Sequence, residues 1–387
     1  MEKSKKPKIR FKGYNDDWEQ RKVQDVADRF DNLRIPVAAN LRVHGTTPYY
    51  GANGIQDYVD GFTHDGEFVL VAEDGANDLR NYPVKCVNGR VWVNNHAHVL
   101  QGKARIADNS FLAFAISQSD IESLLVGGGR AKLNAETLMS IEFSLPCLQE
   151  QYRIGEYLSQ LDNLITLHQR KLDKLINVKK SMLEKMFPKQ GSTVPEVRFS
   201  GFTEDWEQRK LGELILEYKK TVDSSCTLPV LTSSKTEGVI LQEEHFGRKQ
   251  QHDITGYNVL PRSFCTYRNR SDGVDFTFNV NECCDMGIIS KFYPVFCGND
   301  NDTFFLSLVL NNSDEVVHEI AFTCIGTGQK VLSFLDLQKM SIRVPKQSEQ
   351  KKISTYFKQL DDLITLHQRK LEKLKNIKKS MLEKMFI

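Results

Sequence analysis

A long internal repeat constrains this sequence more than any other feature. Residues 161–187, LDNLITLHQRKLDKLINVKKSMLEKMF, recur at 360–386 as LDDLITLHQRKLEKLKNIKKSMLEKMF, and 23 of the 27 positions are identical. A helix that only fills a protein core tolerates many exchanges of one apolar residue for another. Near-identity between segments 199 residues apart therefore indicates two copies of one structural device.

A second repeated block opens each copy. Residues 7–23, PKIRFKGYNDDWEQRKV, match residues 195–211, PEVRFSGFTEDWEQRKL, at 10 of 17 positions. We call these two blocks the first and second heads. Residues 127–151, which precede the first repeated helix, also align without gaps onto residues 326–350. The repeat thus extends beyond the helix itself.

An unrepeated stretch lies inside each copy, and we call residues 24–126 the first body and residues 212–325 the second body. Strand-like runs alternate there with turns, and PYYGANGIQDYVDG at 48–61 is a loop rich in glycine and asparagine. TFFLSLVL at 303–310 fits a strand or a helix. The other strand-like runs are EFVLVAEDG (67–75), GRVWVNNHAHVL (89–100), GVDFTFNV (273–280) and MGIISKFYPVF (286–296). Each body is expected to be a compact α+β domain.

The repeated helices have the spacing of a coiled coil. From Ile154, and again from Ile353, apolar positions follow at alternating steps of four and three residues. Histidine and lysine interrupt both series at equivalent places. The predicted seam consists of Ile154, Leu158, Leu161, Ile165, His168, Leu172, Leu175, Ile353, Phe357, Leu360, Ile364, His367, Leu371 and Leu374.

Each helix could pack on its own domain, or the two helices could pair with each other. We favour an antiparallel pair with pseudo-two-fold symmetry, in which His168 and His367 meet at the seam. About 38 residues make a helix of roughly 57 Å, long enough to hold two bodies at a fixed spacing. The expected α+β architecture has globular domains at 1–147 and 191–346, joined by spacer helices at 148–190 and 347–387.

Charge is distributed unevenly along the chain. Residues 13–149 carry 12 basic and 18 acidic residues, and residues 191–345 carry 15 and 21, so each segment has a net charge of −6. The repeated helices are basic. Because lysine and arginine contacts to phosphate dominate non-specific DNA binding, any DNA binding must use local basic loops or the positive surface of a partner.

Several loop residues are suited to contacting nucleic acid. Arginine can pair bidentately with guanine and asparagine with adenine, while tyrosine can stack or bind phosphate. For each residue the alternative is an ordinary solvated side chain. The candidates are Arg42, His44, Tyr49, Tyr50, Asn53, Arg80, Asn81, Arg130, Lys132, Arg248, Lys249, Tyr267, Arg268, Asn269 and Arg270.

The sequence contains no catalytic motif that we would assign. It has no P-loop, no Asn/Asp-Pro-Pro-aromatic motif and no dinucleotide-binding glycine motif after a strand. His96 and His98 lack a cysteine or acidic residue at ligand spacing, so we favour a hydrogen-bonding role over a metal site. Eight cysteines without a C-x-x-C pair, no signal peptide and no membrane-length apolar run predict a cytoplasmic protein with reduced thiols.

The duplicated order of head, body and helix resembles the specificity subunit of type I restriction-modification systems. PYYGANGI, GEFVLVAEDG and VWVNNHAHVL resemble that family's target-recognition domains. SLPCLQEQYRIGEYLSQLDNLI and RVPKQSEQKKISTYFKQLDDLI resemble its conserved regions. The resemblance implies a subunit without catalytic residues, in which each domain recognises one half of a split DNA target.

The resemblance also implies the partners: double-stranded DNA, two methyltransferase subunits and restriction motor-nuclease subunits, and no membrane. S-adenosylmethionine, ATP and Mg are then expected on those partners, and no cofactor or metal on this chain. Two alternatives stay open, a self-contained DNA methyltransferase or nuclease and a coiled-coil tether with two protein-binding modules. Methyl transfer by the purified chain alone would favour the first.

Overall fold

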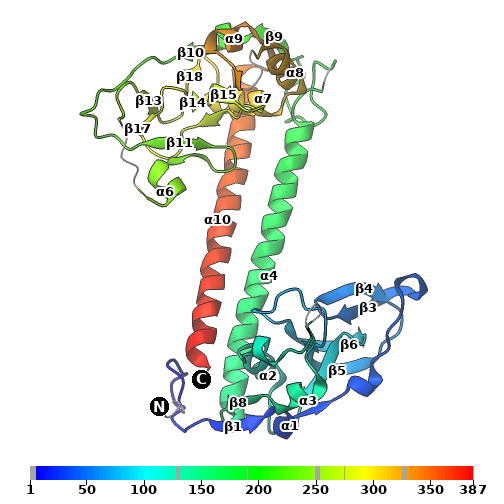
Figure 1. Ribbon diagram of the computed structural model, residues 1–387. Helices are drawn as coiled ribbons and strands as arrows, with labels where there is room; N and C mark the ends of the chain where they lie inside the picture. The colour runs from blue at the N-terminus through cyan, green and yellow to red at the C-terminus, as the bar shows by residue number, and fades with distance from the viewer. Residues whose placement is uncertain are drawn as a thin grey trace. The chain divides into compact units, whose positions relative to one another are not determined.

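The computed structural model describes residues 6–127, 131–189, 191–248, 253–273, 275–324 and 329–386. The chain divides into two compact units, the first made of Met1–Arg170 with His367–Ile387 and the second of Lys171–Leu366. The two long helices are α4 (Leu148–Lys185) and α10 (Gln347–Met385) (Figure 1). Each unit therefore contains one head, one body and a part of both long helices.

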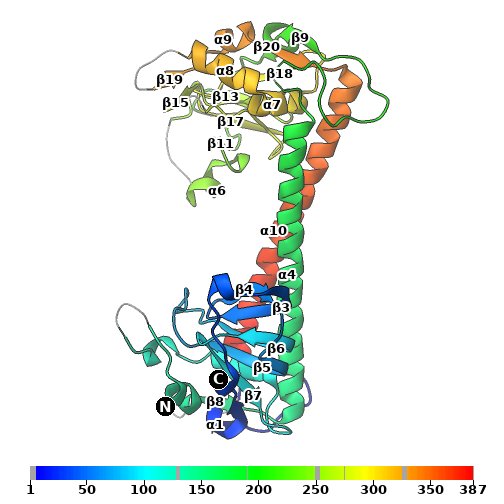
Figure 2. The ribbon, with the colours of Figure 1, turned by 90° about the vertical axis from the view of Figure 1, so that its right-hand side faces the viewer.

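The first body is built on a six-stranded sheet with the order β2-β7-β5-β6-β3-β4. All neighbours are antiparallel except β3 and β6, and Figure 2 shows the strands from β4 to β7 in this order beside α4. The strands are β2 (Ala27–Arg29), β3 (His44–Gly51), β4 (Gly54–Val59), β5 (His64–Ala72), β6 (Val84–Val93) and β7 (Ala97–Gly102).

Both faces of this sheet are covered. Val69 and Val71 of β5 lie in the main core with α2 (Asn109–Ser117), whereas Phe68 and Leu70 face a smaller core on the other side. The period-two alternation of a strand explains this division. The remaining elements of the unit are β1 (Glu19–Lys22), α1 (Val23–Val26), the 3₁₀ turns η1 (Asp31–Leu33), η2 (Ala39–Leu41) and η3 (Glu122–Leu124), α3 (Ala135–Ser140), and β8 (Glu142–Leu145), which pairs with β1.

The prediction of a loop at residues 48–61 is wrong, because most of this segment forms the β3–β4 hairpin. Ala52 and Asn53 make its turn, and Gly54 has a φ of +106°, which glycine adopts without a steric penalty. The glycine and asparagine therefore mark a tight turn between two strands.

The second body has shorter strands and more helix. Its largest sheet has the order β10-β18-β14-β16, and the other strands form pairs. The strands are β9 (Glu207–Lys210), β10 (Ile215–Glu217), β11 (Leu231–Ser234), β12 (Gly238–Leu241), β13 (Asn258–Pro261), β14 (Cys265–Thr266), β15 (Arg270–Ser271), β16 (Asn279–Val280), β17 (Met286–Ile289), β18 (Val295–Gly298), β19 (Lys330–Val331) and β20 (Ser341–Val344). The helices are α5 (Leu211–Leu214), α6 (Gln242–Phe246), α7 (Thr303–Asn312), α8 (Asp314–Thr323) and α9 (Phe334–Lys339).

Residues 303–310, which fit a strand or a helix, belong to helix α7. Asp302 caps this helix by accepting a hydrogen bond from the Phe305 amide at 2.8 Å. Among the described residues of the strand-like run 273–280, only those of β16 form a paired strand. The run 286–296 contains β17 and the start of β18, separated by a turn.

The long helices run antiparallel within the first unit. His168 of α4 meets His367 of α10 with their Nδ1 atoms 2.8 Å apart, and Asp162 forms an ion pair with Lys378 at 2.5 Å. Residue numbers thus fall along α10 as they rise along α4. The predicted proximity of the two seam histidines is confirmed, and one ring donates its N–H to the other.

The second unit repeats the antiparallel arrangement. Lys179 of α4 pairs with Asp361 of α10 at 2.5 Å, as Lys378 pairs with Asp162. Each lysine that interrupts the heptad pattern therefore reaches an aspartate of the opposite helix. The buried seam positions are Ile154, Leu158, Leu161, Leu172, Ile353, Phe357, Leu360 and Leu371. The half-buried ones are Ile165, His168, Leu175, Ile364, His367 and Leu374.

Each head packs against the end of the helix from the other repeat. In the first unit Trp18 contacts Phe111 and Phe386, with ring centroids 5.9 and 6.3 Å apart. The equivalent residues of the second unit are Trp206, Phe305 and Phe187. Backbone hydrogen bonds of 2.9 Å, from Ile9 to Lys384 and from Val197 to Lys185, match as well.

Candidate nucleic-acid interface

Each long helix begins with a buried Glu-Gln pair that anchors the head. In the first unit, Glu150 accepts two hydrogen bonds from the Arg10 guanidinium at 2.7 and 2.8 Å. In the second unit, Glu349 accepts two from Arg198, both at 2.7 Å. The hydrogen bond to each carboxylate raises the pKa of its arginine. The repeated glutamates therefore hold the head on the start of the helix.

The glutamine of each pair holds the body. Gln151 donates to the Pro146 carbonyl at 2.9 Å and accepts from the Asp108 amide at 3.0 Å. Asp108 in turn caps α2 by accepting from Phe111 at 2.8 Å. Gln350 makes the equivalent bonds, donating to Pro345 and accepting from the amide of the cap residue of α7. The two residues account physically for the repeated Glu-Gln in the sequence.

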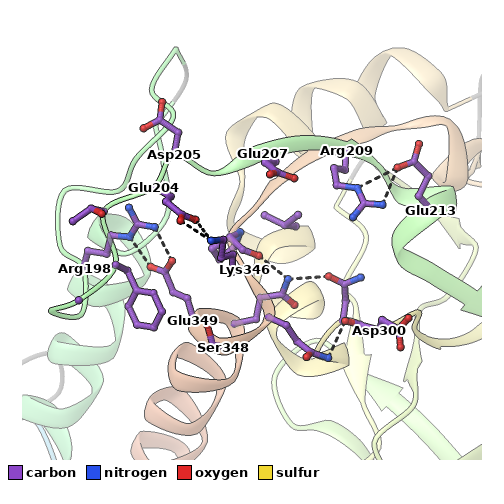
Figure 3. A pocket seen from close by; sticks show the side chains of 18 of the residues that line it. Arg198, Glu204, Asp205, Glu207, Arg209, Glu213, Asp300, Lys346, Ser348 and Glu349 are labelled. Atoms are coloured by element: carbon purple, nitrogen blue, oxygen red, sulfur yellow. Dashed lines mark hydrogen bonds and ion pairs between the residues drawn. The ribbon is translucent and has the colours of Figure 1, made fainter.

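A polar pocket of about 520 Å³ lies at this joint in the second unit (Figure 3). Its three cations are already neutralised, because Arg198 pairs with Glu349, Arg209 with Glu213, and Lys346 with Glu204. The lining carboxylates are Glu204, Asp205, Glu207, Glu213, Asp300 and Glu349. With this excess of negative charge the pocket disfavours phosphate, so a DNA-binding surface of this unit is expected elsewhere.

Two tyrosines proposed as DNA contacts in the first body are buried. Tyr49 is 1% exposed, exchanges hydrogen bonds between its hydroxyl and the Val37 backbone, and lies under the Arg42 guanidinium at 4.1 Å. Arg42 also donates to Asp57 at 3.3 Å. Tyr50 lies in the smaller core, and burial raises its pKa. We therefore remove Tyr49 and Tyr50 from the candidates, because neither presents a surface to DNA.

Other candidates of the first body fix loops. Asn53 donates to the Gly75 carbonyl at 2.8 Å, and Asn81 donates to Asp78 at 2.9 Å. Lys132 forms an ion pair with Glu73 at 2.8 Å. Exposed candidates are His44 and Arg80, and Arg130 lies outside the described residues.

His98 of β7 and His96, which directly precedes this strand, form hydrogen bonds. His98 contacts Asp31 through Nδ1 at 2.7 Å and the Leu133 carbonyl through Nε2 at 2.9 Å. Because a carbonyl only accepts, Nε2 carries a proton. His96 contacts Asp74 at 2.6 Å. Within the described ranges, no cluster of three or more His, Cys, Asp or Glu residues is arranged to hold a metal ion.

The carboxylates around His98 belong to one charged network. Burial alone would raise the pKa of Asp31. The hydrogen bond from His98 and the charge of Arg34 together outweigh burial, so the pKa is lowered. Burial likewise raises the pKa of Glu73, and the ion pairs with Lys132 and Arg34 outweigh it. Both groups therefore stabilise the fold as carboxylates.

The residues of the candidate cluster of the second body differ in exposure. Tyr267 is fully buried, donates its hydroxyl proton to the Leu332 carbonyl at 3.1 Å, and has a pKa raised by burial. Arg268 and Arg270 are exposed, while Asn269 between them is half-buried. We remove Tyr267 from the candidates and keep the two arginines. Arg248 is exposed, and Lys249 lies outside the described residues.

Two exposed phenylalanines, each with a basic side chain close to its ring, are absent from the residues predicted as contacts. The Arg90 guanidinium lies 4.8 Å from the centre of the Phe62 ring in the first body, and Lys291 lies beside Phe292 in the second. The available signal was a basic residue next to an aromatic residue at a turn, as in Lys291-Phe292.

None of the helices in the described part of the chain has the length and hydropathy of a membrane span.

Comparison with protein families finds one model matching twice. The model for the type I restriction modification DNA specificity domain matches residues 15–177 and again residues 203–376. The two matches follow the two repeats.

Known proteins with similar sequences or folds include the following three. A protein of Haemophilus influenzae that bears the name of a type I restriction enzyme specificity subunit is 44% identical over 146 residues. This match covers 38% of this chain and 38% of that relative, well under two thirds of its length. The MjaVIII specificity subunit of Methanocaldococcus jannaschii is 20% identical over 95% of this chain and 91% of its own. The crystal structure of a type I restriction-modification S subunit from M. genitalium aligns over 99% of both chains with a TM-score of 0.68 and 13% identity, which supports the fold.

Proposed function

The chain belongs to the type I restriction modification DNA specificity family, and from this premise we propose that it recognises a bipartite, asymmetric DNA target, one half with each body. The observation that carries the proposal is one head and one long helix repeated around two unlike bodies. Because the two heads and the two long helices are alike, each body is held in the same way by its own head and helix. Because the bodies differ, they select different bases.

Methylation and cleavage are assigned by this proposal to partner subunits. Two methyltransferase subunits would bind S-adenosylmethionine, and motor-nuclease subunits would use ATP and Mg, while this chain supplies the choice of sequence. We also infer a cytoplasmic location, because a chain with this role needs access to DNA inside the cell. The net charge of −6 on residues 13–149 and on residues 191–345 supports a need for partner surface in holding the duplex.

Exposed residues that are identical in both repeats support a partner present twice. Leu164 and Leu167 of α4, and their equivalents Leu363 and Leu366 of α10, are between 43% and 47% exposed. They lie outside the seam, and exposed positions usually accept substitution with little change in stability. A protein that binds once to each unit provides a reason for keeping the same leucines on both.

The strands β1 and β9 give a second example. Both have the sequence EQRK, and all four side chains are exposed in each. Arg21 pairs with Glu19 at 2.7 Å, whereas its equivalent Arg209 pairs with Glu213 at 3.1 Å. The ion pair of this arginine therefore differs between the copies and does not account for its identity in both, which suits a shared external partner.

The test is a methylation map. The chain is co-expressed with its methyltransferase, and methylated adenines are located across a genome. We expect two short, different base groups separated by a constant gap. A continuous or palindromic target would contradict the proposal.

Two further measurements separate this function from its alternatives. Methyl transfer from S-adenosylmethionine by the purified chain alone would indicate a self-contained enzyme. Absence of sequence-specific duplex protection in the presence of methyltransferase would indicate a protein tether. Exchange of residues 24–126 for the body of another family member should change one half-site, and exchange of residues 212–325 should change only the other.

A further inference from the structure

Exposed cations converge on one aromatic ring in the second body. The guanidinium carbon of Arg270 lies 4.7 Å from the centre of the Phe292 ring, and the Lys291 amine lies 5.8 Å from it. Phe292 is itself 38% exposed. Arg268, two residues before Arg270, is exposed as well.

Backbone hydrogen bonds hold these side chains in place. The Asn269 amide donates to the Phe292 carbonyl at 2.9 Å, and the Leu332 amide donates to the Asn269 carbonyl at 3.0 Å. Arg270 also lies in β15, which pairs with β19. The cations are therefore presented from paired backbone segments, which suits a site that must hold a ligand in one position.

Two other basic side chains of the second body are already paired with carboxylates. Arg262 pairs with Asp285 at 2.8 Å, and Lys235 pairs with Asp275. A basic side chain that is paired in this way contributes little positive potential.

By contrast, within the described ranges no carboxylate lies at ion-pair distance from Arg268, Arg270 or Lys291. Asp253 senses the charge of Lys291: the pKa of this carboxyl is lowered mainly by hydrogen bonds from Thr255 and in small part by Lys291. Two like charges that share one ring repel each other, and an anion between them removes that repulsion. The arrangement therefore favours an anionic ligand over a neutral one.

We propose that Arg268, Arg270 and Lys291 bind adjacent backbone phosphates of the DNA half-site recognised by the second body, with Phe292 fixing the spacing of the cations. The inference rests on the proposed function and deepens it. Base edges are neutral, whereas the phosphates of a duplex supply a row of negative charges. Contacts of this kind set the position and register of the domain on DNA and carry no sequence information directly.

The test compares two double variants in the complex with methyltransferase. Arg270→Ala with Lys291→Ala removes two cations of the cluster. Arg262→Ala with Lys235→Ala is the matched control, since it removes the same charge from cations that are already paired. Binding is measured by fluorescence anisotropy over a salt series, with a duplex carrying the methylated sequence and with an unrelated duplex.

We expect the cluster variant to weaken binding to both duplexes alike. Each lost phosphate contact costs roughly fivefold near 0.15 M salt, or about 30-fold for two, and the slope of log K against log salt falls by about 2. The methylated sequence should stay the same, and the control should behave as wild type. Equal effects of both variants, or a changed half-site with an unchanged salt slope, would overturn the inference. If the wild-type complex bound no duplex specifically, the proposed function would fall and this inference with it.

Discussion

Replacing Glu349 with glutamine tests the role of the buried glutamate that anchors the second head. The carboxylate is 1% exposed and accepts two hydrogen bonds of 2.7 Å from Arg198. A glutamine has nearly the same shape, but its amide offers one acceptor oxygen and turns an N–H₂ group toward the second guanidinium donor. Arg198 then stays largely buried without a counter-charge.

The expected cost follows from these contacts. Removing one partner of a buried ion pair costs about 3–5 kcal/mol. We expect about 3 kcal/mol for Glu349→Gln, because one of the two hydrogen bonds survives. For a unit the size of Lys171–Leu366, each kcal/mol lowers the melting temperature by about 2–4 °C. The loss should therefore be roughly 6–12 °C.

Differential scanning calorimetry and urea unfolding measure this loss. The control is Glu204→Gln, which removes the same charge from a largely exposed ion pair with Lys346 and should cost about 0–1 kcal/mol. Replacing Arg198 and Glu349 together with leucine should cost less than Glu349→Gln, because no charge is left buried. A cost for Glu349→Gln no larger than that of the control would refute the reasoning.

Three other outcomes are expected. Replacing His168 and His367 together with leucine should raise the free energy of unfolding by about 1 kcal/mol through apolar burial and loosen the register of the helix pair. Urea unfolding measures the first effect and disulfide trapping between the helices the second. No change in either would mean that the histidines do not set the register. Because the folded-state pKa values of Asp31 and Glu73 are lowered, their stabilisation is complete above about pH 4.5 and is lost as the pH falls through the lowered values. Urea unfolding from pH 6 to 2 should show this loss, and Asp31→Asn should reduce it. Inserting residues into the link 188–205 should change the gap between half-sites in a methylation map and leave the bases of each half-site unchanged.

The long helices were predictable because their signal is long and local. A four-three spacing of apolar residues that starts at Ile154 and continues for several turns has one simple physical interpretation. The hairpin at 48–61 and helix α7 were harder to predict, because eight to fourteen residues give too few periods to separate strand, helix and loop. At 303–310 an unbroken apolar run satisfies both a buried strand and a buried helix, and the Asp302 cap decides the outcome.

The candidate contacts were less predictable because exposure depends on distant parts of the chain. Tyr267 and Arg268 are adjacent, yet the first is buried and the second exposed. The Tyr267 hydroxyl donates a hydrogen bond to the Leu332 carbonyl, which comes from a distant part of the chain. Tyr49 is covered by Arg42. Phe292 lies beside Arg270 because a backbone hydrogen bond joins Asn269 to Phe292, 23 positions further along the chain, and no local sequence pattern shows this contact.

Each head is tied by the same backbone hydrogen bond to the end of the long helix of the other repeat, from Ile9 to Lys384 and from Val197 to Lys185. Eleven residues, 186–196, connect Lys185 to Val197, whereas Ile9 and Lys384 are 375 positions apart in the sequence. The same contact therefore forms once between neighbouring segments and once between segments from distant parts of the chain, so the short covalent link at 186–196 is not what brings a head to its helix.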